Sequence, residues 1–175
     1  MQRYTPLLID DGHPCRHSVG DRWFVDETYV KVAGVWRYVS RAVDQQGQII
    51  EGFVSRRRDI ASARRFSTTA LAKHFAPIEV STVRAAAMAN VIEELIPATF
   101  HNTGSTRATG VNATTVGGTP ASGRCAGLKT DRTASVVIRG HAFVRDLRRG
   151  QYELGVEIAP VYRLATALDE LQLAI

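Results

Sequence analysis

The chain has 175 residues, 45% of them hydrophobic and 22% charged, a composition typical of one globular domain rather than of a disordered or fibrous segment. Its formal net charge of +5 is compatible with a polyanionic partner but does not require one. Cys15 and Cys125 lack the spacing of a zinc site or a disulfide framework, and no apolar run approaches the roughly 20 residues that span a bilayer, so we expect a cytoplasmic protein with no membrane contact.

The clearest predicted strand lies at residues 21–34, DRWFVDETYVKVAG, where aromatic and β-branched residues surround Asp26 and Glu27. Side chains alternate along a strand, so one of these two carboxylates must face whatever covers the sheet. Burying an ionised acid is costly unless the acid is paired or binds a metal ion. This strand alone leaves two interpretations open: an edge strand with solvated or paired acids, or a divalent-metal ligand. The candidate pairing partners are Arg22, Lys31 and Arg41.

The following segments predict a mixed α/β order. VWRYVSRAVD and IIEGFVS are two more strands, which gives an antiparallel meander over residues 23–55. Asp59 is expected to cap a helix in DIASARRFSTTALAKHF, a parallel strand is expected at 78–81, and AAAMANVIEELIP is a helix that ends at Pro97. The apolar positions of the first helix are Ile60, Ala63, Phe66, Ala70 and Leu71. The ribonuclease-H-like fold begins with this order of elements.

Residues 104–127 have a different character, because they are rich in Thr, Gly, Ala and Ser and show no helical or strand period. We expect residues 106–125 to be irregular and exposed, since they offer few large apolar side chains to offset the entropy of ordering. Beyond them, TDRTASVVIRGHAFVRDLRRG predicts a helix with a packed His141 and a basic end at Arg148 and Arg149. A last short helix is expected at 163–173.

Several phrases in the chain form a specific pattern: WFVDETYVKVAG, SRAVDQ, SRRRD, HNT and GLKTDRTA. Together they resemble the catalytic domain of bacterial insertion-sequence transposases of the IS-six family, which are DDE enzymes with an integrase-type, ribonuclease-H-like core. The resemblance implies that residues 21–175 are a DDE-type catalytic core and that residues 1–20 are an N-terminal remnant. It also implies that Asp26 is the first catalytic aspartate and a ligand of Mg²⁺ or Mn²⁺, near the end of the fourth strand, while Glu27 has no such role.

The other two acid positions of the family are occupied by different residues. The phrase EVSTVRAAAMANVIEEL places Val83 at the second aspartate, and counting from His101 places Asn112 at the third acid. Valine has no oxygen ligand and an amide is a poor substitute for a carboxylate, whereas two Mg²⁺ ions need several hard oxygen ligands. The resemblance therefore implies a defective site whose metal binding is lost or weak.

The family phrases also suggest how the Gly/Thr-rich segment arose. Family-type codons shifted by one nucleotide reproduce STR at 105–107 and NATT at 112–115, and the family register resumes at GLKTDRTA. We interpret 104–127 as a frameshifted patch, and a natural flexible loop is the alternative. The family's N-terminal DNA-recognition region is missing before Asp26, so specific recognition of transposon ends is expected to be lost.

Two hypotheses about function follow. The first is a transposase by descent that has lost DNA cleavage and strand transfer. The second is a non-catalytic, basic protein that binds DNA or associates with itself, and so interferes with an intact transposase. His101 is a weaker candidate for a contact with DNA or metal-bound water. The candidate DNA contacts are Arg56, Arg57, Arg58, Arg84, Arg148 and Arg149. The alternative for the SRRRD arginines is a solvated turn, and for Arg148 and Arg149 it is a role as helix-terminal charges.

Overall fold

The computed structural model of the protein describes residues 5–83, 86–103 and 128–174. Two compact units make up the chain. The sheet unit comprises Val19–Ser135, and the helical unit comprises Met1–Ser18 together with Val136–Ile175. The predicted irregular segment at 106–125, Arg84 and Asn112 lie outside the described residues. None of the described helices combines the length and the apolar character needed to cross a membrane.

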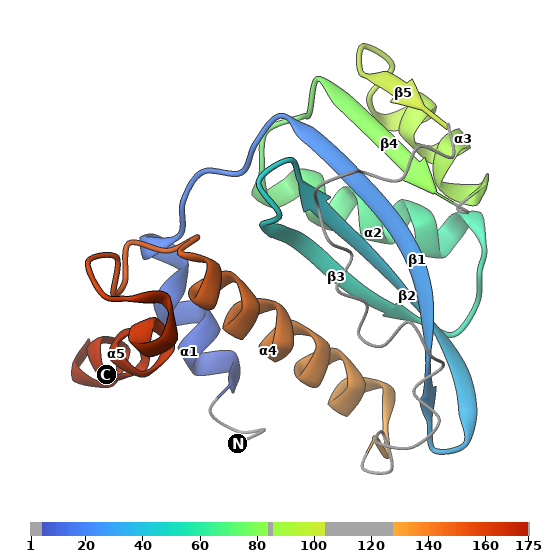
Figure 1. Ribbon diagram of the computed structural model, residues 1–175. Helices are drawn as coiled ribbons and strands as arrows, with labels where there is room; N and C mark the ends of the chain where they lie inside the picture. Colours follow the sequence, from blue (N-terminus) through green and yellow to red (C-terminus); the bar gives the residue numbers. More distant parts are fainter. Residues whose placement is uncertain (1–4, 84–85, 104–127, 175) are drawn as a thin grey trace. The chain divides into compact units, whose positions relative to one another are not determined.

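The described residues of the sheet unit form five strands in the order β3-β2-β1-β4-β5 (Figure 1). They are β1 (Arg22–Val32), β2 (Val35–Asp44), β3 (Ile49–Ser55), β4 (Glu79–Val83) and β5 (Phe100–Asn102). β1, β2 and β3 form an antiparallel meander, β4 is parallel to β1, and β5 is parallel to β4. This order and these directions are those of the ribonuclease-H-like fold and confirm the predicted fold class. β5 was not predicted. The alternative that residues 21–34 form an edge strand is wrong, because β1 is the central strand.

A tight turn sets the register of the first hairpin. Ala33 and Gly34 connect β1 to β2 with positive φ angles of 47° and 82°, as a two-residue hairpin turn of the primed type requires. The turn pairs Val32 with Val35. Each residue of β1 is therefore paired with the residue of β2 that lies equally far from the turn in the sequence.

Two helices cover one face of the sheet, α2 (Ile60–Lys73) and α3 (Ala86–Leu95) (Figure 1). Asp59 caps α2 as predicted, with its carboxylate accepting a hydrogen bond from the Ser62 backbone N–H at 2.8 Å. Phe66 packs on the sheet, but Ile60, which belongs to the same apolar pattern of helical spacing, is exposed in the first turn.

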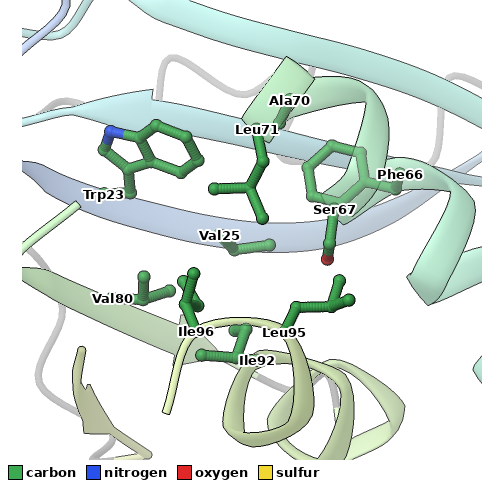
Figure 2. A pocket seen from close by; sticks show the side chains of 10 residues that line it. All are labelled: Trp23, Val25, Phe66, Ser67, Ala70, Leu71, Val80, Ile92, Leu95 and Ile96. Carbon is green, nitrogen blue, oxygen red and sulfur yellow. The ribbon is translucent and has the colours of Figure 1, made fainter. Parts of the chain in front are cut away.

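The core between this face and the two helices is apolar and slightly underpacked. Trp23 and Val25 of β1 and Val80 of β4 meet Phe66 of α2 and Ile92 of α3 there. Figure 2 shows these side chains around a cavity of about 20 Å³, the size of a single small group. Ser67 contributes the one polar side chain of its lining. A gap this small and apolar is a packing defect rather than a ligand site.

The helical unit has its own core. It contains α1 (Thr5–Gly12), the short 3₁₀ helix η1 (His13–Cys15), most of α4 (Asp131–Arg149) and α5 (Pro160–Ala174). Its cluster of buried residues consists of Phe143, Leu147, Tyr152, Leu154, Ala167 and Leu171. Gly12 lies so close to the Phe143 ring that a Cβ there would be 3.0 Å from the ring, which explains the glycine. The sequence patterns did not predict α1, and the expectation that His141 is packed is wrong, because it is exposed on α4.

Candidate functional site

Asp26 lies on the face of the sheet that α2 and α3 leave uncovered. Along β1, Trp23 and Val25 are buried against the helices, so the alternation of side chains directs Phe24 and Asp26 to the other face. The Asp26 side chain is 39% exposed. The first acid position of the family pattern is therefore open to solvent.

Val83 is the direct neighbour of Asp26 in the sheet. The parallel register of β1 and β4 pairs Trp23 with Val80 and Asp26 with Val83, and Val83 is the last residue of β4. Paired positions of neighbouring strands direct their side chains to the same face. A carboxylate at position 83 would thus stand beside that of Asp26, but this chain has an exposed valine there.

Arg41 is the neighbour of Asp26 on its other side. In the antiparallel register of β1 and β2 these two residues are partners. The guanidinium donates two hydrogen bonds to the carboxylate, from Nη2 to Oδ2 at 2.6 Å and from Nε to Oδ1 at 3.3 Å. The Arg41 side chain is only 15% exposed. This two-pronged geometry makes Arg41 the main countercharge of Asp26.

The described residues do not fit a two-metal site. Such a site needs several carboxylates from separate elements, because Mg²⁺ selects hard oxygen ligands. Both oxygens of Asp26 accept hydrogen bonds from Arg41, and Val83 has no oxygen in its side chain. Within residues 5–83, 86–103 and 128–174 there is no group of three His, Cys, Asp or Glu side chains that could hold a metal ion.

Glu27 has a different environment from Asp26. It points to the opposite face, its side chain is 10% exposed, and its Oε2 accepts a hydrogen bond from Arg58 Nε at 2.8 Å. The nearly buried acid of the pair is therefore neutralised by an arginine, as the cost of burying an ionised carboxylate requires. The charge of Arg58 is engaged in this contact.

The other two arginines of the SRRRD phrase differ from each other. Arg56 and Arg37 both donate to Asp131, the first residue of α4, each at 2.7 Å. The hydrogen bond from Arg56, followed by that from Arg37, lowers the pKa of the Asp131 carboxyl below its usual value. Arg57 is exposed and forms no ion pair with another residue in the described parts of the chain. Arg57 is therefore the arginine of this phrase that no ion pair holds in the described residues, although its charge, after the hydrogen bonds from Ser62, helps to lower the pKa of Asp59.

The remaining candidates lie elsewhere. His101 Nε2 is 3.0 Å from Thr82 Oγ1, and Thr82 is paired with the buried Val25, so this histidine is on the face opposite Asp26. Arg148 and Arg149 are exposed at the end of α4, in the helical unit. Arg84 and Asn112 lie outside the described residues.

Arg41 was one of three partners that the sequence offered for Asp26 and Glu27, and the structure pairs it with Asp26, whereas the cluster around Asp131 was not predicted. The pairing of Arg41 with Asp26 could have been found, because a two-residue turn at 33–34 places residue 41 opposite residue 26. Arg37 and Asp131 are 94 residues apart in sequence, and no local pattern links them.

Known proteins show similarity to most of this chain. A family model of the IS240-type transposase, described as a DDE domain, matches residues 20–151. The transposase of insertion sequence-like element IS431mec from Staphylococcus aureus strain Mu50 is 32% identical over 97 residues, 53% of this chain and 43% of that protein. The transposase of IS257 in transposon Tn4003 from the same species matches equally. The chain thus matches less than half the length of these relatives.

Solved structures that match this chain include integrase catalytic core domains. One is the trimeric form of the HTLV-2 integrase catalytic core domain in complex with magnesium, with a TM-score of 0.43 and 12% sequence identity. The match covers 89% of this chain and 85% of the integrase chain. The dimeric form of that domain has a TM-score of 0.42 and 15% sequence identity, and the match covers 54% of this chain and 68% of the integrase chain.

Proposed function

This chain belongs to the IS-six family of DDE transposases, and we propose that it is a derivative that no longer cuts or joins DNA. The observation that carries this proposal is the register of β1 and β4, which pairs Asp26 with Val83. The position best placed to share a metal ion with Asp26 holds an aliphatic side chain. Asn112, at the third acid position by resemblance, supplies an amide in place of a carboxylate.

The chemical consequence follows from charge. Cleavage and joining of a phosphodiester require neutralisation of the charge on the reacting phosphate, which a pair of divalent metal ions supplies in enzymes of this kind. One carboxylate that already accepts two hydrogen bonds from Arg41 is too little to bind such a pair. Loss of two of three acids therefore removes the catalytic step while leaving the fold intact.

We also propose that the protein retains binding to DNA, weak and without sequence preference. The net charge of +5 and the exposed Arg57, whose charge is not used in an ion pair within the described residues, favour this activity. Arg84, Arg148 and Arg149 are further candidate phosphate contacts. Through the same binding, or through association with an intact relative, the protein would interfere with transposition.

The test of the catalytic proposal uses purified full-length chain, labelled transposon-end duplex, and Mg²⁺ or Mn²⁺. We expect neither nicking nor strand transfer, with an intact transposase of the family as the positive control. Val83→Asp alone should stay inactive, because position 112 still lacks its carboxylate. Restoring the family phrase across 105–126 together with Val83→Asp should produce a saturable Mn²⁺ isotherm in calorimetry that Asp26→Ala abolishes. Metal-dependent strand transfer by the unmodified chain, lost in Asp26→Ala, would overturn the proposal.

A further inference from the structure

The end of the first hairpin projects beyond the rest of the sheet. β4 pairs with β1 only as far as Asp26, and β3 pairs with β2 only from Tyr38 onward. Residues 27–32 and 35–37 therefore form a two-stranded ribbon, which can be followed to its tip in Figure 1. Two-stranded ribbons are marginally stable by themselves, so the environment of each face matters.

One face of the ribbon carries Val32 and Arg37, and residues at the start of α4 and just before it contact the ribbon. Val32 is buried there, and the Ala33 N–H donates to the Leu128 carbonyl at 2.8 Å. Arg37 adds its ion pair with Asp131 on the same face. The hydrogen bond from Ala33 and the ion pair of Arg37 hold the ribbon in place.

The opposite face carries an exposed aromatic patch, defined here as Tyr29, Lys31 and Trp36. Tyr29 and Trp36 contact each other edge to face, with ring centroids 5.4 Å apart and an interplanar angle of 87°. The Lys31 ammonium lies 5.7 Å from the centroid of the Trp36 ring. Tyr29 and Trp36 are 62% and 47% exposed, so both rings keep surface that another molecule can contact.

The charge around the patch is positive. The one acid that the ribbon directs to this face is Glu27, and Arg58 neutralises it. Lys31 adds a positive charge that has no carboxylate partner among the described residues. A cross-strand pair of aromatic rings stabilises a hairpin, but that role does not require the rings to be exposed beside a cation.

We propose that the aromatic patch binds single-stranded DNA by stacking bases on Trp36 and Tyr29, with Lys31 contacting the adjacent phosphate. Exposed aromatic rings next to basic side chains are the usual means of binding single strands without sequence preference. A polyanionic partner also fits the net charge of +5 better than an apolar protein surface does. This inference rests on the DNA binding proposed above and assigns part of it to base stacking.

Tryptophan fluorescence tests the proposal directly, because the chain has two tryptophans and only Trp36 is exposed, while Trp23 is buried in the core. We expect that adding oligo-dT of about 20 nucleotides to the full-length protein quenches the Trp36 emission and leaves the Trp23 emission. Trp36→Ala should weaken binding of oligo-dT by roughly fivefold or more, and Trp36→Phe should bind nearly as well as the unmodified chain without the quenching.

Two controls separate stacking from charge and from misfolding. Phe100→Ala removes another exposed aromatic ring of the sheet unit and should leave the affinity for oligo-dT unchanged. Lys31→Gln should lower the slope of log affinity against log salt by about 0.7, whereas Trp36→Ala should leave that slope as it is. Circular dichroism checks that each variant keeps its fold.

Three results would overturn the stacking proposal. If Trp36→Ala and the unmodified chain bind oligo-dT with equal affinity and oligo-dT does not quench the Trp36 emission, the patch is excluded as the binding site, while DNA binding itself stands. No binding of either oligo-dT or duplex by the unmodified chain would refute DNA binding as well. A shift of the Trp36 emission to shorter wavelength as protein concentration rises, in the absence of DNA, would show that a second copy covers the patch.

Discussion

The Asp26–Arg41 ion pair should contribute measurably to the stability of the sheet unit. The perturbation is a double-mutant cycle of Asp26→Asn and Arg41→Gln, which removes both charges. Asp26→Asn keeps the size of the side chain, whereas Arg41→Gln also shortens it. A second cycle on the pair that joins β1 to β4, with Arg22→Gln and Glu79→Gln, serves as the matched control. Arg22 and Glu79 are 3.6 Å apart, with side chains 64% and 29% exposed.

The geometry of the two pairs gives the expected magnitudes. Two charges about 4 Å apart near a protein surface attract by about 4 kcal/mol before desolvation. Desolvation of the 15% exposed Arg41 and solvent screening of the 39% exposed Asp26 offset most of this, but the two hydrogen bonds remain. We expect a coupling of about 1.5 kcal/mol for Asp26–Arg41 and less than about 0.5 kcal/mol for the control pair.

The assay is urea unfolding of all variants, followed by the emission of Trp23 in the core of the sheet unit. The coupling of Asp26 with Arg41 should decrease only slightly on addition of salt, because Arg41 is largely shielded from solvent. A coupling no larger than that of Arg22 with Glu79 would refute the assignment of Arg41 as the countercharge of Asp26.

Three further predictions concern the fold. Phe66→Ala should lower the free energy of unfolding in urea by about 3–5 kcal/mol, because Phe66 is fully buried. Phe100→Ala should change it by less than about 0.5 kcal/mol, because Phe100 is exposed. Equal losses would show that this core is misassigned. Val25→Ile adds one methylene beside the cavity of about 20 Å³ and should raise the free energy of unfolding by up to about 0.8 kcal/mol. A decrease of more than about 1 kcal/mol would mean that the cavity cannot accept the added methylene. The hydrogen bonds from Ser62 lower the pKa of Asp59 below 3.8, so the cap stabilises α2 above pH 3.8 and this stabilisation is lost as the pH falls through the lower pKa of the folded state. Asp59→Ala should therefore lower the melting temperature near pH 6, and this difference from the unmodified chain should shrink in strong acid. A difference that does not depend on pH would contradict this account.

Local patterns in the sequence were enough to predict a large part of this protein. The alternation of β-branched and aromatic residues predicted the meander, and Asp59 with its helical spacing predicted α2, because both depend on residues a few positions apart. The contact of Asp26 with Arg41 belongs to the same class, since the turn at Ala33 and Gly34 is enough to set the register. The family phrases added the hypothesis that Val83 occupies the position of the second acid.

Other features were decided by the tertiary structure alone. β5 has three residues, too few for a period, and it forms because β4 supplies its hydrogen-bonding partner. The exposure of His141 and the burial of Glu27 against Arg58 depend on which segments pack on each face. The pairing of Asp26 with Val83 joins parallel strands separated by β2, β3 and α2, so no turn sets their register. That register results from packing Trp23 and Val80 under α2 and α3, because a slip of one residue would move these side chains out of the core.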